Sequence, residues 1–169
     1  MYLKKFHTTM KLRDKLIQET ILVPMQATSK EGAIHELLTH LQFLDVLSAT
    51  VQLSATIKEK EKVFTSSVGR GIAYPHSTSI EVHELTCVLG ISHEGIDFIS
   101  PDGHDCHIIL LTLSPANDPK EHCKFITRFQ SMVQNPDLRS SLIESAGCDE
   151  ILNIISHWEK DDNQQDDLI

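Results

Sequence analysis

The sequence predicts a three-layer α/β domain, with a mixed β-sheet of about five strands flanked by helices on both faces. Short apolar runs of the kind found in buried strands recur along the chain, and amphipathic helical patterns separate them. A length of 169 residues suits one such domain. We expect this domain to span residues 10–159 and to be followed by an acidic, disordered tail at residues 160–169.

The first part of the chain predicts one strand followed by two helices. The apolar run at residues 21–23 indicates a strand that ends at a proline. Residues 28–31 form a capping box, which predicts the start of the first helix. A second helix is expected over about residues 49–62, with Lys60 at the end of its inward-facing stripe.

Most of the strands are expected in the middle of the chain, at residues 72–74, 86–91, 96–98 and 107–113. The run at 107–113 is almost continuously apolar, so we expect it to be a central strand that is covered on both faces. The Ser-Pro-Asp-Gly sequence at residues 100–103 predicts a turn just before this strand.

Three helices are predicted to complete the domain. Asp118 is expected to cap the first of them, with Pro119 at its first position, so that His122 lies in its first turn. The other two are expected to begin at Pro136 and Asp149.

The most informative stretch is Gly-Arg-Gly-Ile-Ala-Tyr-Pro-His-Ser at residues 69–77. Pro75 lacks the N–H that a sheet ladder requires, so the strand should stop there. His76 would then lie at a strand end, where side chains can reach a ligand. Imidazole titrates near neutral pH, which suits it to proton or group transfer.

His122 is the second candidate for the same site. The free N–H groups and the dipole at a helix start favour an anion. A strand end that carries His76 and a helix start that carries His122 can therefore face one anion. The alternative is a core histidine whose ring bonds to a backbone carbonyl.

Several ordered motifs extend this pattern: Gly95-Ile96-Asp97-Phe98, then Asp102-Gly103, the apolar strand, and the helix with His122. Together with residues 69–77, this set resembles the type-2 enzyme IIA domains of the phosphoenolpyruvate-dependent phosphotransferase system. The resemblance covers roughly residues 20–157. It implies that His76 accepts a phosphoryl group from the carrier HPr or a similar protein, and that His122 supports the phosphorylated site.

The resemblance also implies a phosphate-binding role for Lys60, Ser66 and Ser77, with two departures from the family pattern. The family usually has arginine in place of Lys60, and lysine lacks the bidentate fork of arginine. The family commonly has glycine in place of Ser77. As alternatives, Lys60 is one solvated charge within the run 58–62, and Ser66 is part of a turn.

On this resemblance, we expect a phosphocarrier of the nitrogen-regulatory type, which acts by binding a target protein in one phosphorylation state. One alternative is a sugar-transport enzyme IIA that passes the phosphoryl group to a separate IIB domain. The other is a regulatory binding module that is not phosphorylated at all. Under each reading the partners are proteins.

Other classes of function find little support in the sequence. A net charge of −9 argues against nucleic acid as a partner. The sequence lacks an apolar run long enough for a membrane-spanning helix, and its single, scattered cysteines indicate a reduced, cytoplasmic protein. Adjacent side chains at residues 104–107 would point to opposite faces, so we expect neither a metal site there nor a cofactor.

Overall fold

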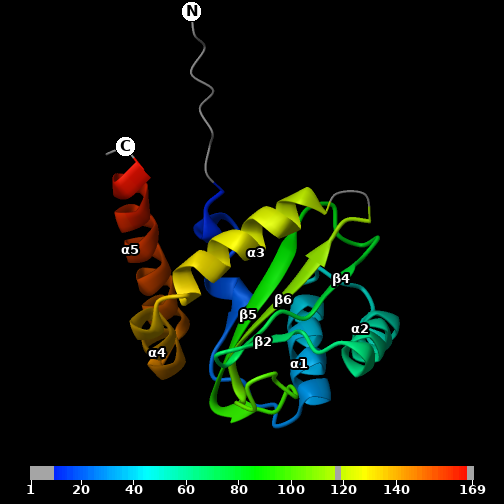
Figure 1. Cartoon of the computed structure of the whole chain (residues 1–169). Helices are drawn as coiled ribbons and strands as arrows, with labels where there is room; N and C mark the ends of the chain where they lie inside the picture. Colours follow the sequence, from blue (N-terminus) through cyan, green and yellow to red (C-terminus); the bar gives the residue numbers. More distant parts are fainter. Residues whose placement is uncertain (1–9, 117–118, 167–169) are drawn as a thin grey trace, which may run out of the picture.

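The computed structural model describes residues 10–116 and 119–166 of the chain. A mixed six-stranded sheet lies between two layers of helices, which confirms the predicted three-layer α/β class (Figure 1). The strands are β1 (Ile21–Leu22), β2 (Ser67–Gly69), β3 (Ile72–Ala73), β4 (His76–Thr78), β5 (Thr86–Ile96) and β6 (Cys106–Ser114). The helices are α1 (Lys30–Phe43), α2 (Val51–Val63), α3 (Lys120–Val133), α4 (Pro136–Glu144) and α5 (Cys148–Asp166).

The sheet is organised around β6, as predicted for the apolar run at 107–113. The strand order is β1-β5-β6-β3-β2, and β4 also pairs with β6. β5 runs antiparallel to β6, whereas β3 and β4 lie end to end along the other edge of β6 and are parallel to it. Pro75 separates β3 from β4, because it cannot donate a ladder hydrogen bond.

Each face of the sheet is covered by its own group of helices. Leu110 belongs to the apolar cluster that packs under α3, α4 and α5, while its neighbour Leu111 belongs to the cluster under α1 and α2. Successive residues of a strand point to opposite faces, so β6 contributes to both layers of the core. This double burial explains its nearly continuous apolar sequence.

Two helices begin one residue later than the sequence predicts. The N-cap of α1 is Ser29, whose hydroxyl accepts a hydrogen bond from the N–H of Gly32 (3.1 Å). Pro119 is the N-cap of α3, and helical residues start at Lys120; the expected cap, Asp118, lies outside the described residues. Shifts of one residue are common at helix ends, and His122 remains in the first turn of α3.

The predicted inward stripe of α2 is wrong in one position. Its buried residues are Ser54, Ile57 and Glu61, whereas Lys60 is exposed. The positions three and four residues after Ile57 flank it on either side, and the packing of the helix turns the later one inward. Glu61 therefore occupies the buried place that the sequence pattern assigned to Lys60.

The C-terminal helix continues into the segment where we expected a disordered tail. α5 runs to Asp166, and three contacts hold its last turns against the domain. The carboxylate of Glu159 accepts a hydrogen bond from the buried N–H of Leu12 (2.5 Å). Arg128 of α3 forms an ion pair with Asp162 and lies 4.4 Å from the ring centroid of Trp158.

The region before β6 differs in part from the prediction. β5 ends at Ile96, so only the first residue of the expected strand at 96–98 belongs to the sheet. The predicted turn follows, and the N–H of Gly103 donates to the carbonyl of Ser100 (3.0 Å). Among the described residues, no helix has the length and apolarity that crossing a membrane requires.

Candidate functional site

His76 is the first residue of β4 and follows the proline that interrupts the sheet edge. It pairs in parallel register with Thr112 of β6, and the carbonyl of Pro75 accepts a hydrogen bond from the N–H of Thr112 (3.1 Å). The imidazole is exposed to solvent. A rigid central strand therefore fixes the backbone at His76 while its side chain stays accessible to another molecule.

The structure brings His76 and His122 together. Paired residues of neighbouring strands share a face of the sheet, so His76 and Thr112 both point toward α3. His122, in the first turn of α3, meets them there. The two imidazole centroids are 5.3 Å apart, and the rings are tilted by 38°.

One hydrogen bond indicates which ring nitrogen of His76 carries the hydrogen. Nδ1 lies 3.1 Å from the carbonyl oxygen of Tyr74. A carbonyl can only accept, so Nδ1 carries the hydrogen, and in the neutral ring Nε2 holds the free lone pair. The nucleophilic nitrogen of His76 is therefore Nε2.

His122 has a different environment. Its Nδ1 lies 3.1 Å from the hydroxyl oxygen of Thr112, a residue that is fully buried. Burial of the ring, and secondarily the charge of nearby His76, lowers the pKa of His122 below its ordinary value. At neutral pH, His122 is therefore a neutral imidazole beside His76.

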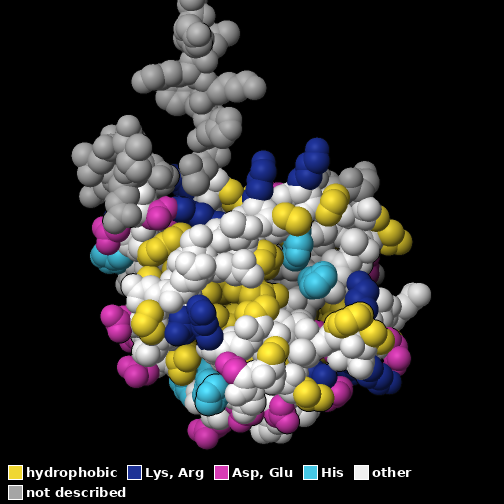
Figure 2. All heavy atoms as spheres, viewed as in Figure 1, with side chains coloured by type: hydrophobic (Ala, Val, Ile, Leu, Met, Phe, Trp, Pro, Cys, Tyr) yellow, Lys and Arg dark blue, Asp and Glu magenta, His cyan; other side chains and the backbone are white. Residues whose placement is uncertain are grey.

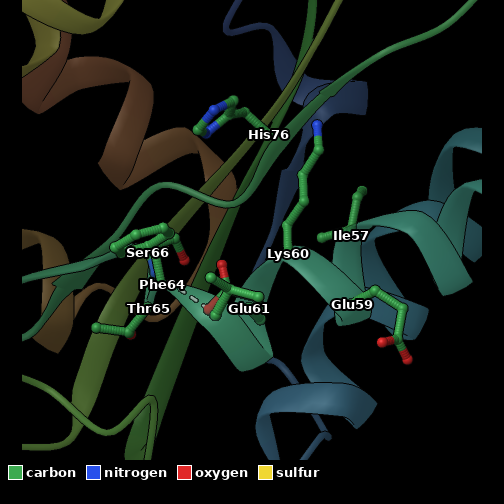
Figure 3. Close-up of a pocket in the computed structure, with 9 residues that line it drawn as sticks. Ile57, Glu59, Lys60, Glu61, Phe64, Thr65, Ser66 and His76 are labelled. Atoms are coloured by element: carbon green, nitrogen blue, oxygen red, sulfur yellow. Dashed lines mark hydrogen bonds between the residues drawn. The ribbon is translucent and has the colours of Figure 1, made fainter.

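A cavity of about 580 Å³ opens beside His76 and is lined by the last turns of α2 and the loop that follows it. Lys60 and Ser66 both line this cavity, so the structure brings both into the neighbourhood of His76. In Figure 3, the side chain of Lys60 extends from α2 toward the strand that carries His76.

Glu61 and Ser66 form the polar floor of this cavity. The carboxylate of Glu61 accepts a hydrogen bond from the N–H of Ser66 (3.1 Å) and is 7% exposed (Figure 3). The buried hydroxyl of Ser66 finds no hydrogen-bond partner among the described residues. Sequence reasoning missed Glu61, because positions 60 and 61 both flank the stripe through Ile57 and only the packing of α2 decides which of them is buried.

The structure does not bring the side chain of Ser77 to the imidazole of His76. Ser77 pairs with Leu113, which faces the α1 and α2 layer, and is buried there. It lines a different cavity, also of about 580 Å³, which Lys60 lines as well. Side chains alternate along a strand, so a residue that directly follows His76 points to the other face of the sheet.

The histidine cluster at residues 104–107 is engaged in local contacts. Nδ1 of His107 bonds to the carbonyl of Ser92 (2.8 Å). Within the described parts of the chain, no group of three or more His, Cys, Asp or Glu side chains is arranged to hold a metal ion.

Comparison with known proteins identifies the family. The model of the family described as "Phosphoenolpyruvate-dependent sugar phosphotransferase system, EIIA 2" matches residues 15–158, which is most of the chain. The protein belongs to this type-2 enzyme IIA family. Enzyme IIA domains are components of a phosphotransferase system, and the paired histidines lie within the matched residues.

Two curated relatives illustrate the range of the enzyme IIA family. The fructose-specific EIIABC component of Bacillus subtilis (strain 168) is 26% identical over 151 residues, which is 89% of this chain but 24% of that protein. The nitrogen regulatory protein of Bradyrhizobium diazoefficiens is 24% identical over 147 residues, which is 87% of this chain and 95% of that protein. The chain thus spans about a quarter of one relative and nearly all of the other.

A solved structure shows the same enzyme IIA fold. The nitrogen regulatory protein IIA-Ntr from Neisseria meningitidis superposes with a TM-score of 0.75 at 23% sequence identity. The superposition covers 84% of this chain and 97% of that one. The likeness extends over nearly the entire domain.

Proposed function

We propose that this protein is a phosphocarrier that accepts a phosphoryl group on Nε2 of His76 from an HPr-like protein. The observation that supports this most directly is the hydrogen bond from Nδ1 of His76 to the Tyr74 carbonyl (3.1 Å). It leaves the lone pair of Nε2 free on an exposed ring, beside a second imidazole and within an enzyme IIA fold.

The reaction exchanges one P–N bond for another. The lone pair of Nε2 attacks the phosphorus of a donor phosphohistidine, and the donor nitrogen leaves with the electron pair of the broken bond. Positive charge develops on the His76 ring as the new bond forms. The Tyr74 carbonyl stabilises that charge through the Nδ1–H, so the protein mainly positions the groups and balances charge.

His122 is the first candidate for contact with the transferred phosphoryl group. In the arrangement we propose, the Thr112 hydroxyl donates to Nδ1 of His122, so that the proton of the neutral ring is on Nε2. That N–H can donate to a phosphoryl oxygen. Lys60 and the unpartnered hydroxyl of Ser66 can supply a further charge and a further hydrogen bond from the other side of His76.

The surface around this site supports a protein as the donor. Val63 and Phe64, at the rim of the cavity beside His76, are 71% and 81% exposed. Ile80, at the rim of the neighbouring cavity that Lys60 also lines, is 89% exposed. Large exposed apolar side chains around a polar site are typical of surfaces that bind other proteins.

The test is phosphorylation of the purified protein with phosphoenolpyruvate, enzyme I and HPr. We expect one acid-labile, base-stable phosphoryl group, bonded to Nε2 of His76 in 15N and 31P NMR spectra. His76→Ala should abolish the labelling, whereas His83→Ala, at another exposed histidine, should leave it unchanged. Persistent labelling of a folded His76→Ala protein would rule out His76 as the acceptor, and no labelling of the wild type would favour a binding module that is not phosphorylated.

We further propose that the protein is of the nitrogen-regulatory type and binds a target protein in one phosphorylation state. The similarity to a nitrogen regulatory protein, 24% identical over 147 residues, supports this. A transport role is the second candidate, and the fructose-specific relative supports it. Phosphorylated protein mixed with the IIB domains of its own organism separates the two: label that stays on His76 favours regulation, and rapid transfer to a IIB domain favours transport.

A further inference from the structure

A third cavity, of about 310 Å³, lies between the C-terminal half of α3 and the β2–β3 hairpin. Figure 2 shows a hollow with an apolar floor in this region of the surface. Ile72 and Val133 supply apolar side chains to its wall, from β3 and α3 respectively. The imidazoles of His76 and His122 do not line it, so it is distinct from the phosphoryl-transfer site.

Tyr74 lines this cavity and carries a buried, unpartnered hydroxyl. The side chain is only 6% exposed, yet its hydroxyl finds no hydrogen-bond partner among the described residues. The ring packs edge-on against Phe129 of α3, with centroids 6.1 Å apart, so its position is fixed. Burial also raises the pKa of Tyr74, which keeps the hydroxyl protonated and able to donate. Buried hydroxyls in proteins are normally hydrogen-bonded, so this one is a donor with an unused hydrogen bond.

The other polar side chains at the cavity are one cation and two amides. Arg70, at the tip of the hairpin, has a positive φ of 58°, and its N–H donates to the carboxylate of Asp102 (2.7 Å). Its guanidinium makes no ion pair within the described ranges. Gln130 of α3 and Gln134, the C-cap of that helix, add side-chain amides to the wall, and each amide can both donate and accept.

We propose that this cavity binds a small organic anion, namely a carboxylate on a compact apolar body. The carboxylate oxygens would receive hydrogen bonds from the Arg70 guanidinium and the Tyr74 hydroxyl, and the apolar body would contact Ile72 and Val133. Guanidinium and carboxylate form charge-assisted, often bidentate pairs, which favours the anion over a neutral molecule of the same shape. An apolar wall with a few convergent polar groups is typical of small-molecule sites.

Binding of a ligand in this cavity should alter the environment of the His76 imidazole. The carbonyl of Tyr74 accepts the hydrogen bond of His76 Nδ1, and α3 carries both Phe129 and His122. A ligand held between Tyr74 and α3 therefore contacts both elements that position the paired imidazoles. This coupling follows from the contacts of Tyr74 and does not require that His76 be phosphorylated.

An NMR titration of the 15N-labelled full chain with benzoate tests the site, with benzamide as its neutral isostere. We expect saturable shifts of the amides at residues 68–74 and 130–134, and binding of benzoate about tenfold tighter than that of benzamide. Arg70→Gln should weaken benzoate binding about tenfold, and Tyr74→Phe, which keeps the ring against Phe129, about fivefold. Lys124→Gln, which removes a cation elsewhere on α3, should leave the affinity unchanged.

The same titration can overturn the proposal. Absence of saturable shifts, or equal binding of benzamide, would reject an anion site. Benzoate-induced shifts confined to residues 57–66 would place the ligand beside His76 instead. The imidazole 15N signals of His76 should also move on binding, and benzoate binding that leaves them unchanged would reject the coupling. Unchanged thermal unfolding of Tyr74→Phe would show that its weaker binding reflects the lost hydroxyl.

Discussion

At the scale of single residues, two hydrogen bonds govern the chemistry that this site can perform. One ties Nδ1 of His76 to a backbone carbonyl, and the other links Nδ1 of His122 to the hydroxyl of Thr112. In the reaction we propose, each bond leaves the Nε2 atom of its ring for contact with a phosphoryl group. The position of an adjacent hydrogen bond, more than the presence of a histidine, decides which atom of each ring can act.

His122 is expected to support transfer without accepting the phosphoryl group. His122→Ala should slow transfer from HPr to His76 by about tenfold to a hundredfold, because the transition state loses a donor. Thr112→Val keeps the shape of residue 112 but removes the hydroxyl that orients His122, so it should slow transfer to a smaller extent. The Thr112→Val effect should vanish in a His122→Ala background. Single-turnover rates of the three variants measure this, and additive effects would show that Thr112 does not act through His122.

The lowered pKa of His122 predicts a dependence of stability on pH. The unfolded state has an ordinary histidine pKa of about 6.5 and therefore binds a proton more readily than the folded state. The contribution of His122 to the free energy of unfolding is thus full above that pH and is lost as the pH falls through the folded pKa. Urea denaturation between neutral and acidic pH should show a smaller loss of stability for His122→Gln than for wild type. A midpoint for His122 at or above the ordinary value, in an NMR titration of the unphosphorylated protein, would contradict this.

At the scale of elements, the end of α2 determines which charges lie at the two cavities that adjoin β4. The helix buries Glu61 and presents Lys60 at two adjoining cavities. A carboxylate that bonds to the Ser66 N–H shapes the loop, and an exposed cation lies next to it. The sign of the charge at the rim thus depends on the rotation of α2 about its axis.

Substitutions of Lys60 therefore test whether the end of α2 affects the rate of phosphoryl transfer. Lys60→Arg should preserve or accelerate transfer from HPr, because the cation remains and gains a bidentate fork. Lys60→Glu should slow transfer by about threefold to tenfold, because it places a like charge near a phosphoryl group of charge about −2. Lys62, which is exposed and pairs with Glu59 (2.6 Å), provides the control through Lys62→Glu. Equal transfer rates for Lys60→Glu and Lys62→Glu at low and high salt would show that Lys60 is not a site residue.

At the scale of the whole molecule, α5 joins the two ends of the described chain. Glu159 accepts the N–H of Leu12 across 147 positions of sequence, and both residues are buried. Arg128 links the same helix to α3 through Asp162 and Trp158. The helix that carries His122 is thereby held against the domain from outside as well as by its own apolar face.

Loss of this link should be measurable as a loss of stability. Glu159→Ala leaves the buried N–H of Leu12 without its partner, so the free energy of unfolding should fall by about 1–3 kcal/mol. Asp161→Ala, at an exposed position two residues later, should change it by less than about 0.5 kcal/mol. Urea denaturation monitored by circular dichroism compares the two. Equal effects would mean that the acidic end of α5 acts only through its net charge.

The sequence by itself determined the architecture and the identity of the acceptor candidate. The apolar run of β6, the strand stop at Pro75 and the histidine that follows it are local features, because each depends on side-chain periodicity or on the geometry of one residue. The helix start before His122 is equally local. Patterns of this kind predict which residues lie at the ends of elements, and those ends carry the site.

Only the tertiary structure decided how these elements face one another. The register of β4 on β6 turns Ser77 away from His76, and the rotation of α2 buries Glu61 in place of Lys60. α5 continues past the expected end of the domain, where Asp162 pairs with Arg128 of α3, and the packing of Tyr74 against α3 leaves its buried hydroxyl unpartnered. Register, rotation and long-range contacts are set by the packing of surfaces that lie far apart in sequence. Local patterns therefore cannot specify them.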